Sequence, residues 1–339
     1  MMKKWKSALQ YFLMLAATVF LVWFSFNSLT VPNSNNTWAD KINYLQKTWQ
    51  QADMQWLWLM AALAMVSHLL RAQRWKMLIT ASGNSVTLLS SFLSLMIGYL
   101  VNLVIPRGGE VSRCLNLLKL HKTPVETSLG TVVVERIADV IFLLIIIALA
   151  FFIQADMLLD FMQTLPIDTS GTSEKVIVLL IFGVAGILLI FLLWRWLKSR
   201  PTLYAKWKKL LGGFQEGLQS VIKLKSKGWF LFHSIAIWAL YFVMTYCVLQ
   251  AFESTQNLGT GAILSVFALG SIAMALPLPG GAGAYHTLVP AGITFLYKIP
   301  SADAIAFVFI FYAWQTLIMI VGGAVSMVVS SLLISTKSK

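Results

Sequence analysis

The densest chemistry in the sequence is the stretch Asn-Leu-Val-Ile-Pro-Arg-Gly-Gly-Glu-Val-Ser-Arg, which begins at Asn102 and ends at Arg113. Its adjacent glycines, Gly108 and Gly109, let the backbone turn sharply. A helix that begins there presents free N–H groups and a positive dipole end, both of which favour an anion. Arg107 and Arg113 are suited to paired contacts with phosphate oxygens. The pattern predicts a turn that binds a phosphate group through these five residues.

In the helix predicted to follow, Glu110, Arg113 and Asn116 recur at three-residue spacing and share a polar face. Such a face is typical of a helix that borders a wet site, where Glu110 would hold an arginine or exchange a proton. The alternative is an interfacial helix on which Glu110 and Arg113 form a solvated pair.

A second polar cluster, Glu135, Arg136 and Asp139, stands at the start of a strongly apolar segment. Glu135 and Asp139 are four residues apart and therefore share one face of a helix. Carboxylates inside a membrane segment are costly unless they meet cations or water, and the expected partners are Arg107, Arg113 and Arg136. The pair is predicted either to carry protons or to lock the preceding segment through buried salt bridges.

A second glycine break, Gly280 and Gly281, follows a proline near the end of the chain and is predicted to contribute further substrate contacts. His286 comes shortly after it. A single histidine is usually a hydrogen-bonded residue, but its ordinary pKa also permits a charge-balancing role. The two cysteines, Cys114 and Cys247, have no metal-ligand spacing, and the sequence predicts neither a metal site nor a cofactor.

The composition determines the class of protein. Hydrophobic residues make up 58% of the 339 residues and charged residues only 12%, and the mean hydropathy is +0.77. A soluble domain carries about 25% charged residues. The sequence therefore predicts an all-α membrane protein that acts within the bilayer.

Six apolar runs are long enough for spanning helices if ~20 residues make one crossing. They lie at 8–26, 54–70, 132–153, 176–194, 229–250 and 304–333. The first run follows lysines, as in a signal peptide. It is longer than a signal core and has no small-residue cleavage site after it, so we expect it to remain as a helix.

Two further regions, 88–122 and 260–299, each contain an apolar leg, a Pro-Gly break and a second leg. If both are re-entrant helical hairpins, most basic residues fall on the cytoplasmic side, as the positive-inside rule requires. This arrangement predicts a multi-pass protein of the inner membrane with both termini in the cytoplasm.

The same arrangement predicts one membrane domain built on an inverted repeat, a recurring plan of transporters. Its expected parts are a first helix and external loop (1–53), a first repeat (54–153), a connecting helix with a basic cytoplasmic loop (154–227) and a second repeat (228–333). The basic loop is expected to contact anionic lipid headgroups. Nucleic acid is not an expected partner, because a folded basic module is absent.

At these residues the sequence resembles the integral-membrane region of lysylphosphatidylglycerol synthases, a family that includes stand-alone flippase-like proteins. The resemblance covers residues 71–323. It rests on Arg71-Ala-Gln-Arg74-Trp75, on Pro-Arg-Gly-Gly-Glu ending at Glu110, on Glu135-Arg136-x-x-Asp139, and on Pro279-Gly-Gly-Ala-Gly283.

The resemblance implies that the chain moves phospholipids or other lipid-linked substrates across the bilayer. The family's aminoacyl-transfer domain has no counterpart in the sequence, so lipid aminoacylation is not expected. An acidic residue is common in the family's second hairpin where this chain has His286, which puts coupling through that acid in question.

The predicted function is therefore a lipid translocase rather than an enzyme, with membrane lipids that carry anionic headgroups as its partners. The alternative is a membrane-embedded enzyme or accessory subunit that acts on lipid-linked sugars. A homo-oligomer or a lipid-modifying enzyme is a further expected partner. The sequence leaves the lipid and the direction of transport open.

Overall fold

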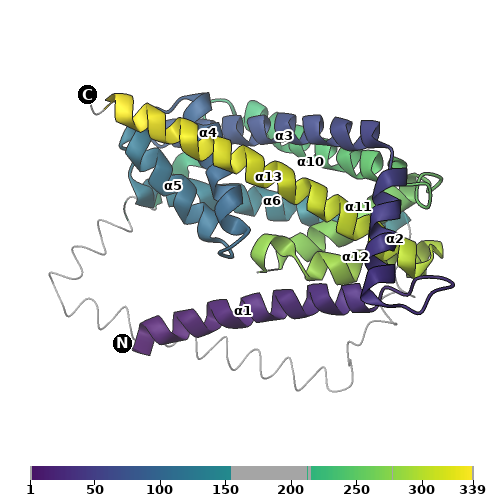
Figure 1. Cartoon of the computed structure of the whole chain (residues 1–339). Coiled ribbons are helices and arrows are strands. Elements are labelled where there is room, and N and C mark those ends of the chain that lie inside the picture. Colours follow the sequence, from purple (N-terminus) through teal and green to yellow (C-terminus); the bar gives the residue numbers. More distant parts are fainter. Residues whose placement is uncertain (1, 154–211, 213–214, 277, 338–339) are drawn as a thin grey trace, which may run out of the picture.

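The computed structural model describes residues 2–153, 212, 215–276 and 278–337 (Figure 1). Its described residues form helices and connecting loops without a strand, which confirms the predicted all-α class. The elements are α1 (Met2–Asn27), α2 (Trp38–Gln51), α3 (Met54–Ala81), α4 (Leu88–Asn102), α5 (Gly108–His121), α6 (Val125–Ile153), α10 (Lys227–Gln250), α11 (Thr260–Ala275), the 3-10 turn η1 (Pro279–Gly281), α12 (Ala284–Tyr297) and α13 (Ser301–Lys337).

Three of the described helices are long and apolar enough to cross a membrane: α6, α10 and the part of α13 from Ser301 to Thr336. Shorter apolar helices are Met14–Asn27 within α1, α4 and α11. The apolar stretch of α6 is only 6% buried within the molecule. Because such a surface is unfavourable in water, lipid is the environment that it fits. The run predicted at 176–194 lies outside the described residues.

Local signals explain where several helices begin and end. Thr37 caps α2 by accepting a hydrogen bond from the backbone N–H of Asp40, whose own side chain completes a capping box. The carboxylate of Asp53 caps α3. At their other ends, α5 and α12 stop at Lys122 and Lys298, which both adopt the left-handed conformation with φ near 57° (58° and 56°). A proline follows two residues after each lysine and prevents the helix from continuing.

The described helices contain one succession twice. A long helix, two short helices and another long helix occur as α3 to α6 and again as α10 to α13. The first helices of the two sets are antiparallel neighbours, because the N–H of Asp53, just before α3, donates to the carbonyl of Ala251, just after α10, at 2.8 Å. Helices α3 and α10 thus run in opposite directions.

The short helices form two helical hairpins at opposite ends of the molecule, α4–α5 near one end and α11–α12 near the other (Figure 1). Their connecting segments face each other between the ends. At this contact, a Cβ atom on Gly280 would lie 3.1 Å from Cδ2 of Leu103. The start of α1 and the end of α13 lie at the same end of the molecule as α5.

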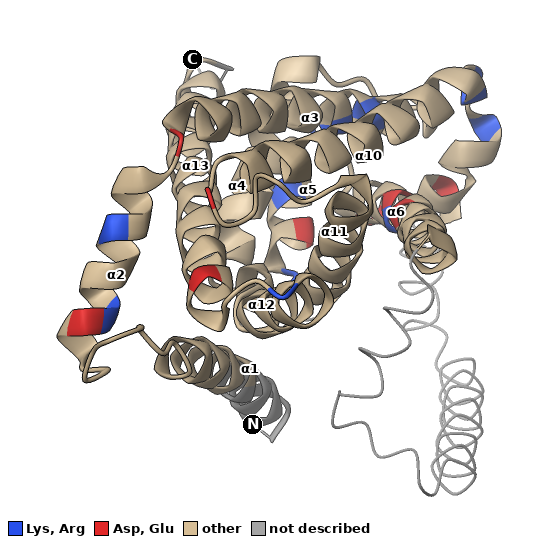
Figure 2. Ribbon diagram, turned by 90° about the vertical axis from the view of Figure 1, so that its right-hand side faces the viewer, with Lys and Arg blue, Asp and Glu red and all other residues tan. Residues whose placement is uncertain are grey.

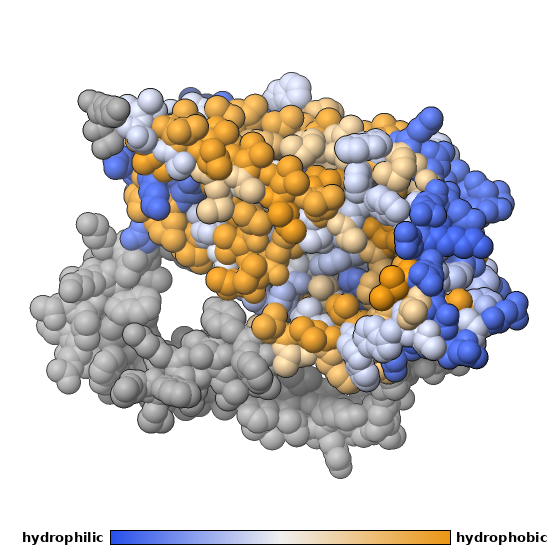
Figure 3. Space-filling view, viewed as in Figure 1, coloured by the Kyte–Doolittle hydropathy of each residue, from blue (hydrophilic) through white to orange (hydrophobic). Residues whose placement is uncertain are grey.

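The largest hydrophobic core lies where α3, α10 and the α11–α12 hairpin meet α13, and Leu57, Met60, Ile293 and Val308 are fully buried there. The described surface in Figure 3 is apolar over its middle and hydrophilic at the end that carries α2. This band is the pattern of a protein surrounded by lipid between two polar layers.

Helix α2 lies at the edge of the helix bundle (Figure 2), in a segment that the sequence analysis treated as loop. Its Lys41 donates to the carbonyl of Asn27 at 2.5 Å, and the hydroxyl of Tyr44 donates to the carboxylate of Asp303 on α13. Partial burial, reinforced by this hydrogen bond and by the negative charge of Asp303, raises the pKa of Tyr44 above its ordinary value.

Candidate functional site

The central feature of the candidate site is the carboxylate of Glu135, buried between two arginines. Its Oε2 lies 2.8 Å from Nη2 of Arg113, and its Oε1 lies 3.7 Å from Nε of Arg74. At most 4% of any of the three side chains is exposed. Neither oxygen accepts a hydrogen bond from the described residues, so the two contacts are ion pairs without hydrogen-bond geometry. Three helices, α3, α5 and α6, meet at this carboxylate.

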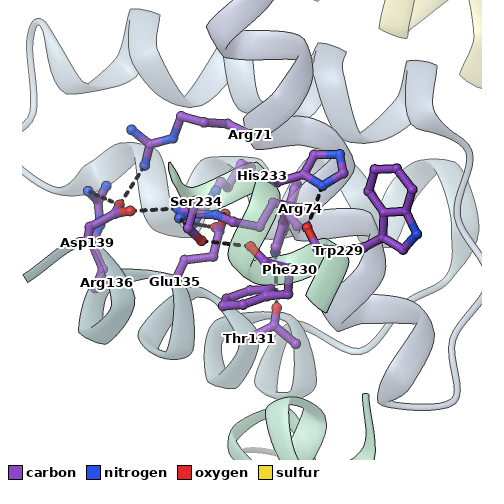
Figure 4. Close-up of polar contacts among 12 residues, drawn as sticks. Arg71, Arg74, Thr131, Glu135, Arg136, Asp139, Trp229, Phe230, His233 and Ser234 are labelled. Atoms are coloured by element: carbon purple, nitrogen blue, oxygen red, sulfur yellow. Dashed lines mark hydrogen bonds and ion pairs between the residues drawn. The ribbon is translucent and has the colours of Figure 1, made fainter. Parts of the chain in front are cut away.

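Asp139 follows one helical turn further along α6 and binds two arginines of α3. Its Oδ1 accepts a hydrogen bond from Arg74 at 2.6 Å, and its Oδ2 accepts one from Arg71 at 3.0 Å. Figure 4 shows these side chains converging on Asp139. Arg74 contacts both Glu135 and Asp139, so the two carboxylates belong to one network. Figure 2 likewise shows acidic and basic residues close together on α6.

Neutral side chains orient the arginines. The guanidinium of Arg113 lies 4.5 Å from the ring centre of Trp75, whose indole N–H donates to the hydroxyl of Thr131 at 3.0 Å. Helix α10 contributes the other supports. Arg74 donates to the hydroxyl of Ser234 at 3.1 Å, and Arg71 donates to that of Tyr241 at 3.0 Å.

The exposed edge of the network is formed by Arg136 and Glu110. Nη2 of Arg136 donates to Oε1 of Glu110 at 2.8 Å, and 46% of the Arg136 side chain is exposed. Arg107 is also exposed and stands at the start of α5 with φ at 60°. The network (Arg71, Arg74, Arg113 and Arg136 with Glu110, Glu135 and Asp139) therefore has four cations and three anions, which leaves one positive charge without counting Arg107.

The glycine turn is more closely packed than the sequence suggested. The N–H of Gly109 donates to Oδ1 of Asn102 at 2.8 Å, and that of Gly108 donates to the carbonyl of Ile105 at 2.9 Å. A Cβ atom on Gly109 would lie 2.0 Å from the carbonyl oxygen of Gly98. Gly109 is thus required for the close approach of α4 and α5, and these two N–H groups already have partners in the protein.

The polar face expected on α5 is directed inward along its length. The side chain of Asn116 donates to Ser94 of α4 at 2.9 Å and accepts from Ser330 of α13 at 2.7 Å. Arg113 on the same face binds Glu135. Beyond Glu110, this face therefore holds helices together instead of bordering solvent.

The second glycine break is held by neutral contacts. Gly280 and Gly281 have φ of 58° and 76°, and the hydroxyl of Tyr312 donates to the carbonyl of Gly280 at 2.8 Å. His286 is buried, with its ring 4.7 Å from that of Phe309 and 4.6 Å from that of Tyr312. Its described contacts lie in α12, in α13 and, through its carbonyl, in α1, away from the arginine network.

Of the expected partners of Glu135 and Asp139, Arg113 lies 2.8 Å from Glu135, and Nη1 of Arg136 lies 3.9 Å from Oδ2 of Asp139. Arg107 forms no ion pair with a described residue. Arg71 and Arg74 were not predicted as members of this site, although both belong to a sequence motif. Their three-residue spacing directly after an apolar run was the signal, because two arginines on one helix face in an apolar setting require carboxylates elsewhere.

Chemically, the network is rich in cationic hydrogen-bond donors. In the described part of the chain, no three His, Cys, Asp or Glu side chains are grouped to hold a metal ion. Arginine side chains offer only donors, and a buried guanidinium with spare donors fits phosphate or carboxylate oxygens.

Comparison with known proteins agrees with the membrane environment inferred from the apolar helices. A segment of 78 residues is 38% identical to a UPF0104 membrane protein of Methanocaldococcus jannaschii, and the alignment covers 22% of this chain and 23% of that relative. No solved structure matches the chain. The family model for the lysylphosphatidylglycerol synthase transmembrane region matches residues 15–323, so this multi-pass membrane protein belongs to that family.

Proposed function

We propose that the protein translocates a phospholipid or another lipid-linked phosphate between the leaflets of the inner membrane. The observation that carries the proposal is the network of four arginines and three carboxylates in a membrane protein, buried except at Arg136 and with one excess positive charge. Ionisable groups in such surroundings are costly and usually mark a substrate path. A phosphate group with one negative charge neutralises the excess.

The proposed headgroup contacts are Arg107 and Arg136, the two exposed arginines, with buried Arg113 behind them. Because Glu110 already holds Arg136 at 2.8 Å, an arriving phosphate exchanges places with this carboxylate. Glu135 and Asp139 keep the inner arginines in position. Gly108 and Gly109, with Asn102 as their cap, hold the turn closed so that Arg107 stands beside the path.

We further propose that α4–α5 and α11–α12 are re-entrant hairpins of an inverted repeat, within a protein of six spans whose termini are cytoplasmic. The antiparallel α3 and α10 support this, as do the hairpins at opposite ends whose tips approach each other. The headgroup would pass where the tips meet, beside Gly280 and Gly281, as in transporters whose broken helices meet at the midplane. His286 would adjust the local charge there.

Transport in proteoliposomes tests the function. The purified protein should move a fluorescent phosphatidylglycerol across vesicles, measured by dithionite quenching of the outer leaflet. Arg136→Gln should slow transfer at least tenfold, because it removes an exposed headgroup contact. Lys119→Gln, on the exposed side of α5, is the matched control and should leave the rate unchanged. Equal rates for both variants would remove Arg136 from the path. Turnover of a lipid-linked sugar without transfer would favour the enzymatic alternative.

Labelling of single cysteines tests the orientation. In a variant without Cys114 and Cys247, Lys119→Cys should react with an impermeant thiol reagent only from the cytoplasm. Ser301→Cys, at the exposed start of α13, should react only from outside. Reaction of both from one side would contradict the inverted repeat.

A further inference from the structure

Tyr99 lies at the inner border of the arginine network, in the last turn of α4. The residue before it, Gly98, packs directly against Arg113: a Cβ atom on Gly98 would lie 3.5 Å from Cβ of Arg113. Electrostatic interaction joins the Tyr99 hydroxyl to Arg71, Arg113 and Arg136. The hydroxyl is buried and has no hydrogen-bond partner among the described residues.

The arginines around Tyr99 also have donors to spare. Arg71 uses its two terminal nitrogens on Tyr241 and Asp139, and Arg113 directs one terminal nitrogen to Glu135. The Nε atoms of both arginines are buried without a partner in the described part of the chain. Together with the Tyr99 hydroxyl they make three buried donors without a described partner, two of them on guanidinium groups, and such donors match the oxygens of an anion.

The polar groups continue beyond Tyr99 toward the middle of α3. The ring of His68 lies 4.7 Å from that of Tyr99, and its Nδ1 is buried without a described partner, as is the hydroxyl of Ser67 next to it. His68 is six residues before Arg74 and lies at the midpoint of the 28-residue helix α3. These groups extend the network from the arginines to the centre of the molecule.

We propose that Tyr99, Arg71 and Arg113 form a second, inner phosphate subsite, which the lipid headgroup occupies after leaving Arg107 and Arg136. This inference rests on the proposed function and deepens it. The ligand is a phosphodiester headgroup: one negative charge balances the excess charge of the network, and its unesterified oxygens accept from the three donors. Tyr99 is the residue that makes this position distinct, because its hydroxyl is the neutral donor at the inner side.

The test uses the full chain and Tyr99→Phe, which removes only the hydroxyl and keeps the ring against His68. Tyr246→Phe is the matched control, since Tyr246 lies on α10 against Trp56 and away from the network. Binding of dioctanoyl phosphatidylglycerol in detergent is measured by thermal shift, and transfer of labelled phosphatidylglycerol is measured in proteoliposomes. We expect Tyr99→Phe to weaken binding and slow transfer by five- to tenfold, with no change in the control.

The outcomes distinguish failure of the inner subsite from failure of the proposed translocase function. If the unsubstituted protein transfers lipid and Tyr99→Phe does so equally well with the same affinity, the inner subsite is wrong and the translocase stands. In that case removal of an unsatisfied buried hydroxyl should also raise the melting temperature without ligand. If the unsubstituted protein neither binds nor transfers lipid, the proposed function fails. Inorganic phosphate that binds through Tyr99 more tightly than the short-chain lipid would overturn the lipid as occupant.

Discussion

The two helical hairpins have nearly the same dimensions but hold their polar groups in different ways. The legs of α4–α5 have 15 and 14 residues, and those of α11–α12 have 16 and 14. The first hairpin is joined to its neighbours through charges, chiefly Arg113 with Glu135. The second is joined through neutral groups, such as Tyr312 on the carbonyl of Gly280.

This difference bears on how strongly each hairpin depends on single contacts. A neutral hydrogen bond contributes about 0.5–1.5 kcal/mol net, and its loss is local. A buried ionic network depends on every member, because removal of one partner leaves an uncompensated charge and costs about 3–5 kcal/mol. A buried ionic network is therefore a vulnerable way to hold helices together. This contrast supports the proposal that the headgroup binds beside the first hairpin.

The largest effect should follow from Glu135→Gln, which leaves Arg74 and Arg113 without their shared counter-charge. We expect a loss of about 3–5 kcal/mol in the free energy of unfolding, measured by thermal unfolding in detergent. Glu126→Gln, in the first turn of the same helix and only partly buried, should change stability little. No change in either variant would mean that water already satisfies the inner arginines, and the contrast between the hairpins would lose its energetic basis.

The next effect tests the contact between the hairpins. Gly280→Ala places a methyl group 2.8 Å from the Tyr312 hydroxyl and 3.1 Å from Leu103, at a φ of 58°. Strain of this kind costs about 1–3 kcal/mol, and we expect lipid transfer to fall as the tips separate. Gly259→Ala is the control, because its Cβ atom meets nothing within 4 Å. Normal transfer by Gly280→Ala would show that the tips need not touch.

A smaller effect is expected for Tyr312→Phe, which removes the hydrogen bond to Gly280 but no charge. Stability should fall by about 1 kcal/mol, which is well below the effect of Glu135→Gln, and both variants can be compared in the same unfolding measurement. A loss as large as that of Glu135→Gln would show that the second hairpin is as interdependent as the first.

The smallest effect concerns pH and the contact of Tyr44 with Asp303, outside the arginine network. The folded protein raises the pKa of Tyr44 above its unfolded value of about 10. The contact therefore stabilises the fold fully below about pH 10 and is lost as the pH rises through the folded pKa. Tyr44→Phe should remove this alkaline decline in melting temperature. An unchanged decline would assign it to another group.

Hydropathy predicted the three described helices that are long and apolar enough to cross a membrane, at 132–153, 229–250 and 304–333, but it misplaced ends that depend on partners. The run predicted at 54–70 became α3, which continues to Ala81 through Arg71 and Arg74. The extension is stable because carboxylates of α6 neutralise those arginines, and a count of apolar residues holds no information about that pairing. Similarly, α6 begins at Val125, seven residues before the predicted run at 132–153.

The site was predicted in its residues more than in its connections. Glycine spacing identified the turn at Gly109, but only the structure shows that Asn102 caps it and that Gly98 lies against it. Helix α2 was missed because its apolar residues are too few for a span. Its capping box, Thr37 with Asp40, could have revealed it. The functional roles of these residues and the domain boundaries remain predictions.

The arginine network also has a consequence for how the chain is made. Arg74 leaves the ribosome about 60 residues before Glu135, which at ~5–20 residues per second is a delay of roughly 3 to 12 s. During that interval the arginines of α3 have no carboxylates. If α3 spans the membrane as proposed, each charge costs at most about 2.5–3.5 kcal/mol, the value for the centre of an inserting helix. We therefore expect α3 to remain beside the insertion machinery until α6 emerges, so that the two helices leave it as a neutralised unit. A nascent chain that ends before residue 135 should be found cross-linked to that machinery rather than released into lipid.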